Sequence, residues 1–207
     1  MAEYSNQKPP GVILAGGSAR RLGKVDKCLL MLSGRSLLTH IRSRLEPQTA
    51  MLLLNINSQS PDFDRCELTR IKDNFPPGLG PLAGIASTMQ WLRKQSEPYP
   101  WLCTVPGDSP FLPADLVCRL MAEIDSTAID IVYAMSDERE HFVVGLWSSA
   151  LLPKLLNYLA KGERAVGKFI HQQRCKAITF DSKPFDPFFN INTAEDLKKA
   201  KCIADKY

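Results

Sequence analysis

The sequence predicts a single α/β domain with a mainly parallel central sheet, and three observations support this fold class. Short apolar runs alternate with amphipathic stretches along the 207 residues, as expected of repeated β-α-β units. The chain is long enough to bury a substantial core, and no proline- or glycine-rich linker separates two comparable halves. Polar loops follow several of the apolar runs, at the positions where open α/β sheets bind ligands.

The apolar runs are the predicted strands, and the amphipathic stretches between them are the predicted helices. We expect strands at residues 12–15, 51–54, 70–72, 101–105, 129–134, 143–146 and 177–180. We expect helices at residues 36–45, 82–94, 114–123, 150–160, 165–172 and 194–204. Thr193 precedes Asp196 by three residues, which is the spacing of a capping box at the start of the last helix. The polar segment 58–66 is predicted to be a loop.

The most informative segment follows the first predicted strand. It reads Leu14-Ala15-Gly16-Gly17 and continues into a loop that carries Arg20, Arg21 and Lys27. Glycine lets the backbone approach a ligand closely, while backbone N–H groups and cations there can neutralise phosphate. The spacing matches neither the dinucleotide fingerprint nor the P-loop. The segment therefore predicts a site for a nucleoside triphosphate, although a glycine-rich turn with solvated basic residues has a similar pattern.

A second polar loop follows the predicted strand 101–105 and carries one carboxylate, Asp108. A carboxylate at a strand end lies at the ligand-binding edge of an α/β sheet and can hold Mg²⁺, which prefers oxygen ligands. The alternative is a turn aspartate that caps the next helix, a role that Ser109 or Asp115 could also fill.

Two more segments carry polar residues near predicted strand ends. Asn55 and Asp73 follow predicted strands, and taken alone each is an ordinary turn residue. Residues 188–197 alternate apolar and asparagine side chains, which predicts a strand-like segment that presents Asn190 and Asn192 on one side.

In their order along the chain these motifs resemble the molybdenum cofactor guanylyltransferase family, from about Gly11 to about Leu197. The resemblance implies a three-layer Rossmann-like nucleotidyltransferase fold over residues 1–207, with residues 11–110 mostly binding nucleotide and residues 111–207 mostly binding molybdopterin. The implied reaction transfers GMP from GTP to molybdenum-molybdopterin and releases pyrophosphate, with Mg²⁺ as the cofactor. Ala15-Gly16-Gly17, where related cytidylyltransferases tend to carry Ala-Ala-Gly, favours GTP.

The resemblance also implies roles for individual residues. Asp108 would hold the metal, and it would act in catalysis together with Lys27 and Arg21, with Arg20 as a helper. The implied nucleotide-binding residues are Leu14, Ala15, Gly16, Gly17, Lys27, Asn55, Asp73 and Asp108. The implied molybdopterin-binding residues are Arg164, Asn190 and Asn192, although Arg164 is equally well explained as a solvated surface residue.

One segment departs from the family pattern. Relatives often show His-Pro after an acidic and arginine-containing run, whereas this chain has Phe142 after His141. We expect residues 137–142 to form a loop near the pterin and His141 to be a surface residue outside the catalytic set.

Composition bounds the partners and the location. The formal net charge of +4 suits an anionic ligand but falls short of a nucleic-acid-binding footprint. No apolar signal core opens the chain and no run approaches membrane-spanning length, so we expect a cytoplasmic protein with no membrane partner. The six cysteines form no C-x-x-C pair and are expected to be reduced, buried thiols. The resemblance also implies transient contacts with cofactor-donor and molybdoenzyme-maturation proteins.

Three alternatives stay open at the level of sequence. The first is a cytidylyltransferase for the same cofactor, and the second is a nucleotidyltransferase for a sugar phosphate. The third is a non-catalytic protein that binds nucleotide or pterin and delivers it. A delivery protein would have no need of the carboxylate that Asp108 supplies.

Overall fold

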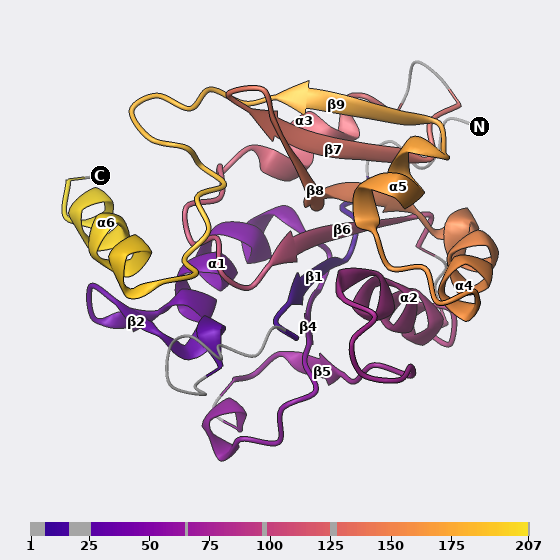
Figure 1. Ribbon diagram of the computed structural model, residues 1–207, viewed down its shortest axis with the longest axis horizontal. Coiled ribbons are helices and arrows are strands. Elements are labelled where there is room, and N and C mark those ends of the chain that lie inside the picture. Colours follow the sequence, from indigo (N-terminus) through magenta and orange to yellow (C-terminus); the bar gives the residue numbers. More distant parts are fainter. Residues whose placement is uncertain (1–6, 17–25, 65, 97–98, 125–127, 207) are drawn as a thin grey trace.

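The computed structural model describes residues 7–16, 26–64, 66–96, 99–124 and 128–206, which form one large sheet with helices on both faces and a separate hairpin (Figure 1). The strands are β1 (Gly11–Leu14), β2 (Met31–Leu32), β3 (Arg35–Ser36), β4 (Leu52–Asn55), β5 (Thr69–Ile71), β6 (Trp101–Pro106), β7 (Ile131–Ser136), β8 (Arg139–Ser148) and β9 (Cys175–Thr179). The helices are α1 (Leu37–Leu45), α2 (Pro81–Leu92), α3 (Leu116–Met121), α4 (Leu152–Ala160), α5 (Val166–His171) and α6 (Ala194–Ala204). Within the described residues, no helix combines the length and the apolar character that a membrane span needs.

The large sheet has seven strands in the order β5-β4-β1-β6-β8-β7-β9, and most neighbours run parallel. β1 pairs in parallel with β4 on one side and with β6 on the other, and β8 is antiparallel to both β6 and β7. Leu14 at the end of β1 lies beside Asn55 of β4 and Pro106 of β6. The carboxyl ends of the three central strands are therefore level, and the segments that follow them meet at one edge of the sheet.

The sheet is the middle of three layers, because alternate side chains of its strands enter two different cores. Val12 packs on one face with residues of α2, α4 and α5, which lie together on one side of the sheet in Figure 1. Ile13 packs on the other face with residues of α1 and α3. Side chains buried on both faces explain why these strands read as continuous apolar runs. The predicted α/β class with a mainly parallel sheet is confirmed.

Helix α6 packs outside the main layers, against the β2–β3 hairpin. A third apolar cluster, which includes Leu32, Phe111 and Ile191, lies beneath it. The predicted capping box is present: Thr193 Oγ1 accepts a hydrogen bond from Asp196 N–H, and the Asp196 carboxylate accepts one from Thr193 N–H. This cap fixes where α6 begins, directly after the segment that carries the two asparagines.

Most predicted elements are present with ends shifted by one to three residues, but one hairpin was missed and two predictions were wrong. The β2–β3 hairpin was not predicted, because two-residue strands are too short to show periodicity. Residues 137–142 are not a loop: Asp137 and Glu138 form a tight turn at φ 44° and 62°, and β8 begins at Arg139. Residues 188–193 belong to no strand and follow an irregular path.

Candidate active site

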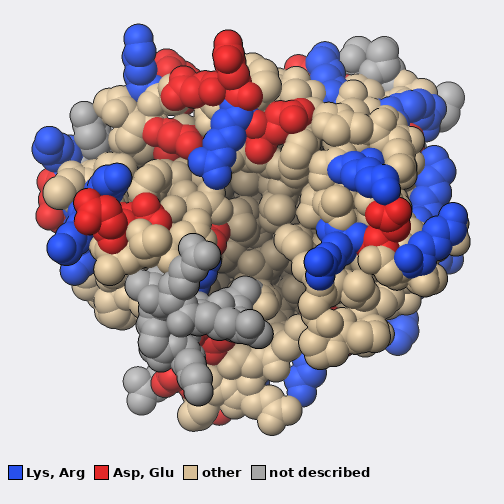
Figure 2. Space-filling model, in the orientation of Figure 1, with Lys and Arg blue, Asp and Glu red and all other residues tan. Residues whose placement is uncertain are grey.

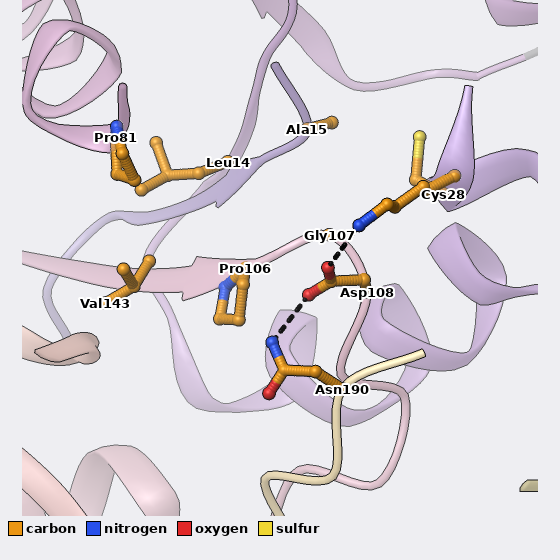
Figure 3. Close-up of a pocket in the computed structure, with 10 residues that line it drawn as sticks. Leu14, Ala15, Cys28, Pro81, Pro106, Gly107, Asp108, Val143 and Asn190 are labelled. Atoms are coloured by element: carbon orange, nitrogen blue, oxygen red, sulfur yellow. Dashed lines mark hydrogen bonds and ion pairs between the residues drawn. The ribbon is translucent and has the colours of Figure 1, made fainter. Parts of the chain in front are cut away.

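Asp108 lies at the centre of a cluster of polar side chains just beyond the end of β6. Its Oδ1 accepts a hydrogen bond from Asn190 Nδ2 at 2.9 Å, and its Oδ2 lies 3.4 Å from Lys27 Nζ. Lys27 Nζ also donates to Asn192 Oδ1 at 2.5 Å, and the Ile191 N–H donates to the backbone carbonyl of Asp108 at 2.9 Å. Figure 3 shows Asn190 and Asp108 pointing toward each other from separate segments. The structure thus joins the loop after β1, the end of β6 and the segment before α6.

The charges in this cluster are partly shielded from water. The side chains of Lys27 and Asp108 are only 21% and 17% exposed. At this degree of burial an ion pair is stronger than it is at an open surface. The hydroxyl of the neighbouring Ser109 is buried and has no hydrogen-bond partner among the described residues. The positive charge of Lys27 therefore compensates the negative charge of the Asp108 carboxylate, and this carboxylate still lines a cavity.

A cavity of about 250 Å³ surrounds this cluster (Figure 3). Its lining, within the described part of the chain, consists of Leu14, Ala15, Lys27, Cys28, Pro81, Pro106, Gly107, Asp108, Val143 and Asn190. Leu14 and Pro81 also line a second cavity, so the two cavities adjoin.

The second cavity has a volume of about 700 Å³, which falls within the usual range of small-molecule sites. The described residues that line it are Leu14, Gly16, Asn55, Asn57, Asp73, Phe75, Pro77, Gly78, Leu79, Gly80 and Pro81. Gly78 and Gly80 have φ of +97° and +69°, a backbone conformation that favours glycine. In Figure 2 the molecule is hollowed near the centre of this face, with Lys and Arg side chains to the right of the hollow and Asp and Glu side chains gathered above it.

Two asparagines orient the carboxylate of Asp73 at the wall of the larger cavity. Asn55 Nδ2 donates to Asp73 Oδ1 and Asn57 Nδ2 donates to Asp73 Oδ2, each at 2.8 Å. Asn57 Oδ1 accepts the Asp73 N–H at 2.9 Å, and Asn55 Nδ2 also donates to Ile71 O at 3.1 Å. Asn57 was not predicted as a site residue. Its position two residues after Asn55 was the available signal, because alternate residues of an extended chain share a side.

The structure brings together most of the residues that the sequence singled out. Those that line one of the two cavities are Leu14, Ala15, Gly16, Lys27, Asn55, Asp73, Asp108 and Asn190. Asn192 joins them through Lys27. Gly17, Arg20 and Arg21 lie outside the described residues.

Arg164 and His141 are both absent from the described lining of the two cavities. Arg164 is exposed on the turn between α4 and α5 and is absent from the described lining of both cavities, so its role stays a prediction. The expectation that His141 is a surface residue was wrong. His141 is 7% exposed, because the unexpected start of β8 turns it into the core beside Phe188.

Cys28 is a cavity residue that sequence reasoning did not assign to the site. Burial, and then the nearby charge of Asp26, raise the pKa of its thiol to about 12, so it is an unreactive neutral group. All six cysteines are free, as expected, but Cys118 and Cys202 are exposed, so the expectation of buried thiols was wrong for these two.

The oxygen atoms around Asp108 suit a hard cation that takes its remaining ligands from water and from a bound phosphate group. Within the described residues, no group of three or more His, Cys, Asp and Glu side chains could hold a metal ion. The oxygens of Asp108 and Asn190 are the kind that Mg²⁺ accepts, and Mg²⁺ commonly binds one or two carboxylates together with waters and substrate phosphates. The residues present therefore fit a metal that is shared with a bound triphosphate.

Comparison with known proteins places the chain in a family. Residues 11–177 match the model of the MobA-like NTP transferase domain. The chain belongs to this family. The molybdenum cofactor guanylyltransferase of Bradyrhizobium sp. (strain ORS 278) is 40% identical over 205 residues, which are 99% of this chain and 97% of that protein. The protein of the same name from Pasteurella multocida (strain Pm70) is 40% identical over 187 residues, or 90% and 96% of the two chains.

Solved structures show the same fold at lower identity. Molybdopterin-guanine dinucleotide biosynthesis protein A from Archaeoglobus fulgidus superposes with a TM-score of 0.77 at 21% identity, covering 96% of this chain and 100% of that one. The 4-diphosphocytidyl-2C-methyl-D-erythritol synthase from Anaerococcus prevotii superposes with a TM-score of 0.71 at 14% identity, covering 100% of both chains. These likenesses confirm the three-layer Rossmann-like nucleotidyltransferase fold.

Proposed function

We propose that this chain transfers GMP from GTP to the phosphate of molybdenum-molybdopterin, forming molybdopterin guanine dinucleotide and pyrophosphate. The observation that carries the proposal is the compensated carboxylate of Asp108, which faces a cavity adjoining a second one of nucleotide size. Full-length relatives at 35–41% identity bear the name of this activity.

The nucleotide would occupy the larger cavity, and residues 11–110 would supply most of its contacts. Leu14, Ala15, Gly16 and Gly17 would offer backbone groups to the guanine and the ribose. The carboxylate of Asp73, held from both sides by Asn55 and Asn57, would present fixed acceptor atoms to the same ligand. A preorganised acceptor costs little to order when the ligand binds.

The triphosphate would extend from there to the smaller cavity. Asp108 would hold Mg²⁺, which when bound would polarise the phosphate oxygens and make pyrophosphate a better leaving group. Lys27 and Arg21 would neutralise the triphosphate. Lys27 is already positioned by Asp108 and Asn192, and its long side chain can turn from them to a phosphate oxygen.

The acceptor would be bound mostly by residues 111–207, with Arg164 on its phosphate and Asn190 and Asn192 near the reacting groups. An oxygen of the acceptor phosphate attacks the α-phosphorus of GTP, the bond from that phosphorus to the bridging oxygen breaks, and pyrophosphate leaves with the electron pair. No protein nucleophile is needed, so catalysis consists of positioning and charge neutralisation.

Location and partners form a secondary part of this proposal. Six free cysteines are typical of a reducing compartment, and we place the reaction in the cytoplasm. The family resemblance supports transient contacts with proteins that donate the cofactor or mature molybdoenzymes, and no nucleic acid is expected to take part.

Calorimetric titration of GTP, CTP and ATP in the presence of Mg²⁺ tests the proposal. We expect GTP to bind best. Replacing Lys27 with alanine should weaken GTP binding by about 10-fold or more, because a charge-assisted contact contributes about 1.5–3 kcal/mol. Lys198→Ala, at an exposed position on α6, is the matched control and should leave the affinity unchanged.

Turnover with molybdenum-molybdopterin then decides between the alternatives. Release of pyrophosphate from GTP only when the pterin is present supports the guanylyltransferase. A preference for CTP would identify a cytidylyltransferase, and turnover with a sugar phosphate would identify the other enzyme. Nucleotide binding without any turnover would favour a delivery protein, and the absence of nucleotide binding would contradict the proposal.

A further inference from the structure

A chain of three polar side chains lies where β7, β8 and the segment after β9 meet. Ser136 ends β7 and is buried, His141 is buried on β8, and Asp186 follows β9 in the sequence. His141 Nε2 is 2.7 Å from Ser136 Oγ, and Ser136 Oγ donates to Asp186 Oδ1 at 2.8 Å. No part of the proposed mechanism uses these groups.

The hydrogen bonds fix the protonation of the histidine. A serine hydroxyl has a single proton, and here that proton is donated to Asp186. Ser136 Oγ can therefore only accept from His141, so Nε2 carries a hydrogen. Burial lowers the pKa of His141, with the nearby Asp186 opposing this shift and Arg139 adding to it, so the ring is a neutral donor at neutral pH.

Asp186 is the first residue of a short irregular segment that reaches the candidate active site. We name residues 186–192 the strap. Asp186 Oδ1 also accepts the Phe188 N–H at 2.9 Å, and the Phe188 ring packs on His141 with a centroid separation of 4.8 Å. The start of the strap is thus fixed by the same three side chains and by one aromatic contact.

The other end of the strap lies on the catalytic cluster. Asn190 and Ile191 both hydrogen-bond to Asp108, and Asn192 accepts from Lys27. Because the strap belongs to no strand, backbone ladder bonds do not set its position. Its position depends on the buried side chains of Phe188 and Ile191 and on the hydrogen bonds at its two ends, of which only those at the Asp186 end lie outside the site.

We propose that Ser136, His141 and Asp186 are positioning residues, which anchor the strap so that Asn190 meets Asp108 and Asn192 meets Lys27. This inference rests on the proposed function for its kinetic consequence. Ser136 and His141 are buried and Asp186 is half-buried, and polar groups placed in this way contribute less to stability than an apolar cluster of the same volume would, so the arrangement calls for a role in conformational specificity. Small displacements of positioned groups lower turnover strongly.

Matched substitutions separate anchoring from general stability. His141→Leu removes the donor, while His141→Gln keeps an N–H at the end of the side chain. Ser136→Ala and Asp186→Ala remove the other two hydrogen-bonding side chains of the group. Asp130→Ala is the control, because Asp130 precedes β7 at the opposite end of that strand, where Arg174 binds its two carboxylate oxygens at 2.9 and 2.7 Å.

Two readouts are measured on each full-length variant. Hydrogen exchange by mass spectrometry on peptides that cover residues 186–193 reports whether the strap is held, and it needs no substrate. Steady-state kinetics with GTP and molybdenum-molybdopterin separates kcat from the KM for GTP. Thermal denaturation confirms that each variant is folded.

We expect His141→Leu, Ser136→Ala and Asp186→Ala to speed exchange in the strap and to lower kcat by about 10-fold or more, with the KM for GTP unchanged. His141→Gln should retain most of the strap's protection from exchange and most of the wild-type kcat. Asp130→Ala should lower the Tm but change neither strap exchange nor kcat. Strap exchange like that of the wild type in the folded Ser136→Ala variant would overturn the proposal, as would equal effects of Asp130→Ala. If the wild-type protein does not turn over these substrates, the proposed function fails, and strap exchange alone decides whether the three residues act as an anchor.

Discussion

Replacing Gly84 with alanine should distort the larger cavity, chiefly through a collision with Asn55. Gly84 lies in the first turns of α2, and an added Cβ would be 2.1 Å from Asn55 Oδ1 and 2.7 Å from Asn55 Cγ. Asn55 is 3% exposed and cannot swing into solvent. It would have to give up its hydrogen bonds to Ile71 and Asp73, or α2 would have to move away from the sheet.

The size of the effect follows from one favourable and two unfavourable contributions to the free energy of unfolding. Alanine is favoured over glycine inside a helix by about 1 kcal/mol. Overpacking a tight core costs about 1–3 kcal/mol, and a buried amide that loses its partners costs a further 1–3 kcal/mol or so. The free energy of unfolding of the variant should therefore be lower by about 3 kcal/mol, which corresponds to a fall in Tm of about 6–12 °C for a chain of this size.

Thermal denaturation of Gly84→Ala in two backgrounds tests this reasoning. Asn55→Ala removes the amide that the new methyl group would meet. In that background the glycine substitution should cost nothing or stabilise the protein by up to about 1 kcal/mol. An equal loss of stability in both backgrounds would show that the collision with Asn55 is not the cause. GTP titration should also show weaker binding for Gly84→Ala, since Asp73 loses one of its two partners.

Two further predictions concern charge and thiol chemistry. Arg174 holds the pKa of Asp130 below its ordinary value, so the native state binds fewer protons than the unfolded state. The resulting stability is present above about pH 4 and disappears as the pH falls through the native pKa. Asp130→Asn should therefore lower the Tm at neutral pH and narrow the difference from the wild type in acid, and a difference that is constant with pH would contradict this origin. With iodoacetamide under native conditions, mass spectrometry should find Cys118 and Cys202 modified first, whereas Cys28 should react only on unfolding; early modification of Cys28 would contradict its burial.

Much of the fold and of the nucleotide side of the site could be predicted from the chain alone. Strands such as β1 and β4 are buried on both faces, so their apolar runs are continuous and easily recognised. Residues that follow parallel strands must meet at one edge, which is why Asn55 and Asp108 lie beside adjoining cavities. The polar residue types at those strand ends carried most of the information about the ligand.

The β7–β8 hairpin could not be predicted for a specific physical reason. Its turn is made by Asp137 and Glu138 at positive φ, where glycine or asparagine is the usual signal. The following charged residues resemble a solvated loop, yet Glu140 accepts a hydrogen bond from the Tyr133 hydroxyl and His141 enters the core. Pairing with β7 assigns these side chains to their environments, and pairing partners are not visible in local sequence.

The strap shows the same limit in its strongest form. Lys27 and Asn192 are 165 positions apart in the sequence and share one hydrogen bond. The strap has no regular secondary structure, so no strand register fixes where its residues lie. Family resemblance pointed to Asn190 and Asn192, whereas the residues that hold the strap had no motif of their own. His141 was expected to be a surface histidine, and Ser136 and Asp186 were not singled out. A site assembled by an irregular segment depends on side-chain hydrogen bonds at both ends of that segment. Its supporting residues therefore become recognisable only when the tertiary structure shows which buried polar groups meet.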